Sequence, residues 1–219
     1  MTWVKICGMT NLEDALTAVD AGADAVGFVF YEKSPRCVSV ETAREIVAKL
    51  PENVEKVGVF VDSKVQDAKE MFLHAGLTMA QVYGESVDEW YAWFESEGTK
   101  LMWAIPGNPL NNGVFTSLGS YKKRITALLV DSGSGDRPGG TGVRFDWETA
   151  KMGIWHLGTR VPIVVAGGLT PDNVNDAVRT LTPWGVDVVS GVEASPGKKD
   201  PEKVRAFVRA VREYDQRAL

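Results

Sequence analysis

Two glycine-rich turns near the C-terminal end of the chain have the composition of a phosphate-binding site. Gly167 and Gly168 follow the run PIVVA, and Ser190 and Gly191 follow the run GVDVV. Backbone N–H groups of such turns can surround a phosphate when the turns lie side by side. Each turn alone could need glycine only for its backbone conformation, but the pair together favours phosphate binding.

Four further residues stand where they could take part in chemistry. Cys7 ends the run TWVKIC, Asp131 follows ALLV, Asp187 lies within GVDVVSG, and Arg36 lies within KSPRCVS. Each also has a structural explanation. Cys7 could be an inert buried thiol, and Asp131 could cap its loop by accepting backbone N–H bonds. Arg36 could be a solvated surface charge, and Asp187 a structural hydrogen-bond acceptor.

Other familiar site patterns are missing from the sequence. It contains neither G-x-x-x-x-G-K-[ST] nor G-x-S-x-G, and a G-x-G-x-x-G match fails at Pro138. Neither the Cys and His spacing nor the acidic residues fit a metal site. His74 and His156 fall in predicted helices and are expected to be surface or packing residues. The aromatic residues at helical spacing in one segment are expected to pack in the core: Trp90, Trp93 and Phe94.

The chain alternates short apolar runs with helical patterns, and these elements must position the candidate residues. The runs expected to be strands are Thr2–Cys7, Ala25–Phe30, Lys56–Val61, Met79–Gly84, Lys100–Ile105, Ile125–Asp131, Val161–Gly168 and Gly185–Gly191. The expected helices are Asn11–Gly22, Ser39–Leu50, Lys64–Ala75, Asp88–Glu97, Trp147–Leu157 and Pro201–Tyr214. A further helix is expected with Thr170 as its N-cap and Pro171 in its first position. The segment Pro106–Gly119 holds the weakest helical pattern.

Eight strand–helix units in a chain of 219 residues favour an α/β fold, a single-domain (β/α)8 TIM barrel over residues 1–219. Near-continuous apolar strands are typical of parallel strands covered on both faces. An open doubly wound sheet is the alternative, although it usually has fewer units. In a barrel the carboxyl ends of the strands meet at one mouth, so the candidate residues would meet there.

Composition limits the classes of partner and location. The net charge of −5 gives no basic excess, which argues against nucleic-acid binding. No segment approaches the roughly 18 apolar residues that would cross a membrane, and the N-terminus lacks a signal-peptide pattern. The two cysteines, Cys7 and Cys37, do not make a disulfide framework. We therefore expect a cytoplasmic protein with reduced thiols.

The loop Asp131–Trp147 is long and rich in glycine. Because it begins at a candidate aspartate, we interpret it as a lid over the site. A plain flexible surface loop is the alternative.

Five segments together resemble the phosphoribosylanthranilate isomerase family of tryptophan biosynthesis. They are KICGMTNLEDA, GADAVGFVF…KSPRCVS, LLVDSGSGDRPGGTGVRFDW, VVAGGLTPDNV and GVDVVSGVEASPGKKD, in order from Lys5 to about Asp200. One such motif alone would be weak, but five in order at predicted strand ends are specific.

The resemblance implies an isomerase of the intramolecular oxidoreductase class, acting on a small phosphosugar without a metal or organic cofactor. The reaction would be the Amadori rearrangement of N-(5-phosphoribosyl)anthranilate to 1-(2-carboxyphenylamino)-1-deoxyribulose 5-phosphate, in a monomer or homodimer. By the same resemblance Cys7 is the general base and Asp131 the general acid. Arg36 would hold the anthranilate carboxylate, and Asp187 would orient the substrate. The phosphate-binding residues would be Gly167, Gly168, Ser190 and Gly191.

Two positions depart from the family pattern. The family usually has QLHG where this chain has QVYG, so Tyr83 replaces a histidine. An aromatic residue often follows SPR in the family, where Cys37 stands here. Neither change removes a candidate catalytic group, but both could alter pocket shape and substrate affinity.

Two other functions stay open. A related barrel enzyme could act on the aminoaldose of the histidine pathway, which would require two phosphate sites where the sequence suggests one. A non-catalytic barrel that binds a phosphometabolite is the other alternative, and the intact pair of Cys7 and Asp131 argues against it.

Overall fold

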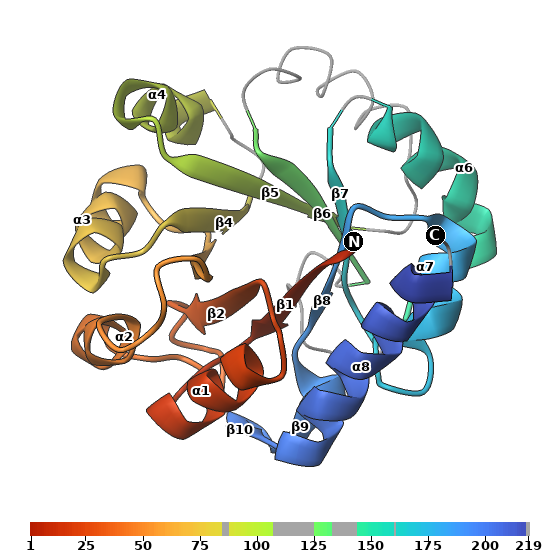
Figure 1. Ribbon diagram of the computed structural model, residues 1–219. Helices are drawn as coiled ribbons and strands as arrows, with labels where there is room; N and C mark the ends of the chain where they lie inside the picture. The colour runs from red at the N-terminus through yellow and green to blue at the C-terminus, as the bar shows by residue number, and fades with distance from the viewer. Residues whose placement is uncertain (85–87, 107–124, 133–143, 160, 218–219) are drawn as a thin grey trace.

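The strands of the computed structural model, which describes residues 1–84, 88–106, 125–132, 144–159 and 161–217, form a parallel barrel. It closes in the order β1-β2-β3-β4-β5-β6-β7-β8, with β8 paired to β1 (Figure 1). The strands are β1 (Trp3–Cys7), β2 (Ala25–Val29), β3 (Glu55–Val61), β4 (Met79–Tyr83), β5 (Lys100–Pro106), β6 (Ala127–Asp131), β7 (Ile163–Val165) and β8 (Gly185–Val188). The predicted eight-stranded α/β barrel is confirmed, whereas a single domain over residues 1–219 stays a prediction.

Helices lie outside the ring of strands, as Figure 1 shows. They are α1 (Leu12–Asp20), α2 (Val40–Val47), α3 (Val65–Ala75), α4 (Asp88–Glu97), α6 (Trp147–Gly158), α7 (Val174–Leu181) and α8 (Pro201–Arg217). Side-chain caps explain where two of them begin. The side-chain oxygen of Asn11 accepts the N–H of Asp14 at the start of α1, and that of Ser39 accepts the N–H of Thr42 at the start of α2.

The apolar core has two layers, because alternate strand residues point to opposite faces. One cluster fills the barrel interior and includes Met79, Met102 and Leu129. The larger cluster lies between the strands and the helices, where it includes the predicted core residues Trp90 and Trp93. His74 and His156 are exposed on helices α3 and α6, so they are surface residues, one of the two roles expected for them.

Three predicted boundaries near the C-terminal end are wrong. Strand β7 ends at Val165 and β8 at Val188, so both glycine-rich turns lie beyond their strands. Gly167 and Gly168 have φ of +84° and +64°, which no strand residue adopts. Helix α7 begins at Val174 and not after Thr170, because residues 171–173 form a turn in which the N–H groups of residues 173 and 174 both bond to the carbonyl of Thr170.

A short segment between β8 and α8 was not predicted. It contains a turn of 3-10 helix, η1 (Ser190–Val192), and a two-stranded hairpin of β9 (Glu193–Ser195) and β10 (Lys198–Lys199). Two predictions lie outside the described residues: the weak helix within Pro106–Gly119, apart from Pro106 itself, and most of the lid Asp131–Trp147. Among the helices that the structure describes, none combines the length and apolar character needed to cross a membrane.

Candidate active site

The carboxyl ends of the strands surround a cavity of about 70 Å³. It is lined by all the residues singled out from the sequence: Cys7, Arg36, Asp131, Gly167, Gly168, Asp187, Ser190 and Gly191. Cys7 ends β1 and Asp131 ends β6, so the thiol and the carboxyl reach the cavity from different sides of the barrel. Both side chains are buried. The structure therefore brings the candidate residues together at one mouth, as the barrel interpretation requires.

A buried lysine lies directly beneath Cys7. Strand alternation places Lys5 on the same interior face as Cys7, and the β1–β8 register pairs Lys5 with Asp187. The Lys5 Nζ atom donates to Asp187 Oδ1 at 3.0 Å and to Gln81 Oε1 at 2.7 Å. Its positive charge also acts on the Cys7 side chain. Lys5 has no solvent exposure, so these contacts replace the water that its ammonium group loses.

The protonation of Cys7 follows from two opposing influences. Burial raises the pKa of the Cys7 thiol, and the positive charge of Lys5 only partly offsets this. For Lys5 itself burial lowers the pKa, but Asp187 and Cys7 outweigh it and leave that pKa raised. The ammonium group therefore keeps its charge at neutral pH, while Cys7 is mostly in the thiol form in the free protein.

This balance predicts an alkaline titration of Cys7. In a Cys37→Ser variant, the ultraviolet absorbance of the thiolate should rise with pH, with a midpoint above that of an ordinary cysteine. The direction follows because the raised pKa keeps the proton on sulfur to higher pH. The variant lacking both cysteines supplies the baseline for tyrosine ionisation. A midpoint below the ordinary value would contradict the dominance of burial.

Asp131 is held by a tyrosine from the neighbouring part of the barrel. The Tyr83 hydroxyl donates to Asp131 Oδ2 at 2.9 Å, and Ser132 Oγ lies 3.4 Å from Asp131 Oδ1. Tyr83 is one of the two residues, with Cys37, at which the sequence departs from the pattern that the resemblance implies. Its effect is therefore not confined to pocket shape, since it contacts the candidate acid directly.

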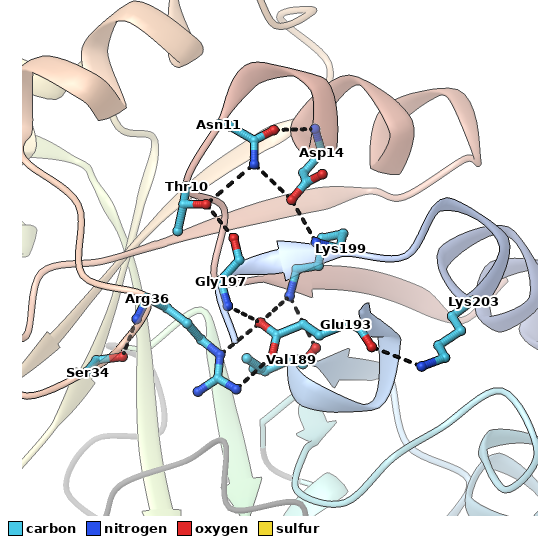
Figure 2. Close-up of polar contacts among 10 residues, drawn as sticks. All are labelled: Thr10, Asn11, Asp14, Ser34, Arg36, Val189, Glu193, Gly197, Lys199 and Lys203. Atoms are coloured by element: carbon cyan, nitrogen blue, oxygen red, sulfur yellow. Dashed lines mark hydrogen bonds and ion pairs between the residues drawn. The ribbon is translucent and has the colours of Figure 1, made fainter. Parts of the chain in front are cut away.

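Arg36 forms a bidentate ion pair with Glu193, a residue that the sequence interpretation missed. Figure 2 shows the guanidinium beside Glu193, whose Oε1 and Oε2 accept from Nε at 2.9 Å and Nη2 at 2.7 Å. Lys199 Nζ also contacts Glu193 Oε1 at 3.3 Å. Burial alone would raise the pKa of Glu193, but Arg36 and Lys199 outweigh it and hold that pKa below its usual value. Glu193 therefore stays charged and fixes the plane of the guanidinium.

Glycine is required at the glycine-rich turns by close contacts. A Cβ atom on Gly191 would lie 1.8 Å from the Leu169 carbonyl oxygen, and one on Gly167 would lie 2.2 Å from Ser132 Oγ. Close approach of neighbouring atoms therefore excludes a side chain at both glycines, and only Gly167 of the two also has a positive φ, +84°. The prediction of phosphate binding rests instead on the fact that both turns line the same cavity.

Comparison with known proteins places the chain in a family. A family model described as N-(5'phosphoribosyl)anthranilate (PRA) isomerase matches residues 4–210. The chain belongs to this family. The PRA isomerase of Chlorobaculum parvum is 43% identical, over 99% of this chain and 97% of its own length. That of Geobacter sp. (strain M21) is 45% identical, over 95% of this chain and 97% of its own length.

Solved PRA isomerase structures share the fold. The Thermotoga maritima structure superposes with a TM-score of 0.83 at 37% identity, covering 97% of this chain and all (100%) of that one. A PRA isomerase in complex with reduced 1-(o-carboxyphenylamino)-1-deoxyribulose 5-phosphate gives a TM-score of 0.81, also at 37% identity, with the same coverage of 97% and 100%. These similarities confirm the resemblance read from the sequence.

Several polar residues of this PRA isomerase family member were missed by the sequence interpretation. Lys5 carried a usable signal, because a charge inside an apolar strand needs a buried partner, and strand alternation puts it on the Cys7 face. Gln81 gave a similar signal, because it is a polar residue inside the apolar strand β4. Glu193 and Lys199 offered none, since their position depends on a hairpin that no pattern predicted. Within the described residues no group of three or more His, Cys, Asp or Glu side chains is placed to hold a metal ion.

Proposed function

We propose that this chain catalyses the Amadori rearrangement of N-(5-phosphoribosyl)anthranilate to 1-(2-carboxyphenylamino)-1-deoxyribulose 5-phosphate. One observation carries the proposal. Cys7 and Asp131 are buried on different sides of a single cavity, whose lining also contains Arg36 and both glycine-rich turns. Family membership of the whole barrel supports the same reaction.

Substrate binding follows from the two ends of the cavity. Glu193 occupies Nε and Nη2 of Arg36, and among the described residues Nη1 has no hydrogen-bond partner. The Nη1 and Nη2 edge can therefore receive the anthranilate carboxylate. The amides of the Gly167–Gly168 and Ser190–Gly191 turns receive the phosphate. The ribose is then held between Cys7 and Asp131. Binding therefore supplies the entropy loss of orienting the ribose toward both groups before the reaction begins.

The chemistry requires two proton transfers. Protonated Asp131 donates to the furanose oxygen, the C1′–O bond breaks, and the nitrogen lone pair forms an iminium ion. The iminium acidifies the C2′ proton, which the Cys7 thiolate removes to give an enolamine. Protonation at C1′ and loss of the 2′-hydroxyl proton then give the ketone. Lys5 supports the thiolate that this step needs, since its charge lowers the pKa of Cys7 against the effect of burial.

A steady-state assay tests the proposal. Anthranilate fluorescence should fall when the purified protein meets N-(5-phosphoribosyl)anthranilate, and the aminoaldose of the histidine pathway should not turn over. Turnover of only the histidine intermediate would reject the assignment. Binding without turnover, even at high protein concentration, would favour the non-catalytic barrel.

Replacement of Arg36 should mainly affect binding. In Arg36→Met we expect KM to rise by roughly 10-fold to 150-fold with a smaller change in kcat, because a charge-assisted pair contributes about 1.5–3 kcal/mol. Arg179→Met is the matched control, since Arg179 is exposed on α7 and, within the described part of the chain, its ion-pair partner is Asp176 on the same helix. An unchanged KM in Arg36→Met would remove Arg36 from the site.

The cellular location and the assembly stay predictions. We expect a cytoplasmic protein that is a monomer or a homodimer. The Thermotoga maritima relative is described as dimeric, so light scattering of this chain in solution is the direct measurement.

A further inference from the structure

A chain of hydrogen bonds runs from Lys5 to Asp131 through Gln81 and Tyr83, which line the cavity together with Asp131. Lys5 Nζ on β1 donates to Gln81 Oε1 at 2.7 Å. Gln81 Nε2 on β4 donates to the Tyr83 hydroxyl at 3.3 Å, and that hydroxyl donates to Asp131 Oδ2 at 2.9 Å. Lys5, Gln81 and Asp131 are all buried. Lys5 shares the interior face of β1 with Cys7 and its charge lowers the pKa of that thiol, so the chain begins next to the candidate base and ends at the candidate acid.

The direction of this chain follows from chemistry. An ammonium group has hydrogen-bond donors and no acceptor, so the Gln81 atom facing Lys5 must be the oxygen. The amide NH₂ of Gln81 then faces Tyr83 and occupies a lone pair of its hydroxyl oxygen. The single hydroxyl hydrogen is left to point at Asp131. Lys5 thereby determines that Tyr83 is the donor in its hydrogen bond with Asp131.

We propose that Tyr83 is a positioning residue for the general acid Asp131, and that Lys5 and Gln81 fix the direction in which its hydroxyl donates. The inference rests on the proposed function, since it assigns Tyr83 a part in that reaction. It also gives a role to one of the two positions at which this chain departs from the family pattern.

The consequence for Asp131 concerns its two oxygens. The carbonyl oxygen of a carboxylic acid accepts hydrogen bonds better than its hydroxyl oxygen. Oδ2 accepts the shorter bond, at 2.9 Å from Tyr83, whereas the Ser132 hydroxyl lies 3.4 Å from Oδ1, so the acidic proton is placed on Oδ1. After that proton moves to the substrate, the new carboxylate charge is stabilised by the hydrogen bond that Tyr83 already donates, which favours the transition state for ring opening.

Tyr83 is suited to act as a permanent donor. Burial, with the nearby Asp131 and Asp187 charges, raises the pKa of the Tyr83 hydroxyl well above its usual value. The hydroxyl therefore keeps its hydrogen throughout the reaction and is not itself the acid.

The first test is Tyr83→Phe, which removes only the hydroxyl. We expect kcat to fall roughly 10-fold to 150-fold, the range for a lost hydrogen bond to a charged group, with less than about a threefold change in KM. Tyr214→Phe on α8 is the matched control and should leave both constants unchanged. Tyr83→His should keep more activity than Tyr83→Phe, because an imidazole can accept from Gln81 and donate to Asp131 through its second nitrogen.

The second test reverses the direction in which the Tyr83 hydroxyl donates its hydrogen bond. In Gln81→Glu both side-chain oxygens accept hydrogen bonds, so the Tyr83 hydrogen should turn away from Asp131. We expect a loss of kcat comparable to that of Tyr83→Phe, and the double variant should lose little more than either single one. If Gln81→Glu fails to fold, Tyr83→Phe alone decides.

An isotope effect separates positioning from a general structural defect. With substrate deuterated at C2′, the isotope effect on kcat should shrink in Tyr83→Phe, because ring opening becomes slower than removal of the C2′ proton. An unchanged kcat in Tyr83→Phe, or an equal loss of kcat in Tyr214→Phe, would overturn the inference while leaving the proposed function intact. Absence of turnover in the unaltered protein would overturn both.

Discussion

Replacing Asp131 with Asn should lower kcat by about 10²–10⁴-fold, the usual contribution of a positioned acid. The amide cannot protonate the furanose oxygen, so ring opening loses its proton donor. Product binding should stay nearly intact, because the Asn oxygen can still accept from the Tyr83 hydroxyl that holds Asp131 Oδ2 at 2.9 Å. Steady-state kinetics and a calorimetric titration with the product measure the two effects.

The matched control for this variant is Asp176→Asn. Asp176 is exposed on α7 and pairs with Arg179 one turn later, and such surface pairs contribute little. Its kinetics should equal those of the unaltered protein. If Asp131→Asn weakens product binding as much as it lowers kcat, the residue holds the ligand and is not the acid.

Replacing Cys7 with Ser should have an effect of similar size, about 10²–10⁴-fold on kcat. An alcohol is a far weaker acid than a thiol, so the serine hydroxyl of this variant would not supply the anion that removes the C2′ proton. The fold should tolerate the change, because the sulfur lies tightly against Gly27, where an added Cβ would approach it to 2.5 Å, and the smaller oxygen fits the same space. Lys5 keeps Asp187 and Gln81 as partners.

Cys37→Ser is the control for loss of a thiol. Cys37 is exposed and does not line the cavity formed by the described residues, so its replacement should leave kcat unchanged. The isotope effect from a C2′ deuterium should grow in Cys7→Ser, since the slowed step is the removal of that proton. A normal kcat in Cys7→Ser would show that Cys7 is an inert buried thiol and not the general base.

The barrel could be predicted because its strands are covered on both faces and therefore read as apolar runs. The same property located the site, since a polar residue at the end of such a run must face the mouth. Cys7 and Asp131 were found in this way, and the resemblance to the family gave their proposed roles. Ser39 likewise marked the start of a helix through its capping oxygen.

The remaining features depend on contacts between distant segments. Glu193 reaches Arg36 across 157 residues, and no local pattern encodes that pair. The early ends of β7 and β8 were missed because apolar composition continues past the point where the backbone leaves the strand. The turn after Thr170 was missed because Pro171 and Asp172 also fit the first turn of a helix. Tyr83 was noticed only as a departure, since its bond to Asp131 needs the register of β4 and β6 around the barrel.

The ion pair of Lys5 and Asp187 has a consequence for assembly of the protein. It joins residues 182 positions apart, on the first and last strands of the ring, where the barrel closes. A nascent chain that has released only its early strands carries Cys7 but no counter-ion for Lys5. The protein can therefore catalyse the reaction only after β1 and β8 have paired. Recovery of activity during refolding would measure the closure of the barrel.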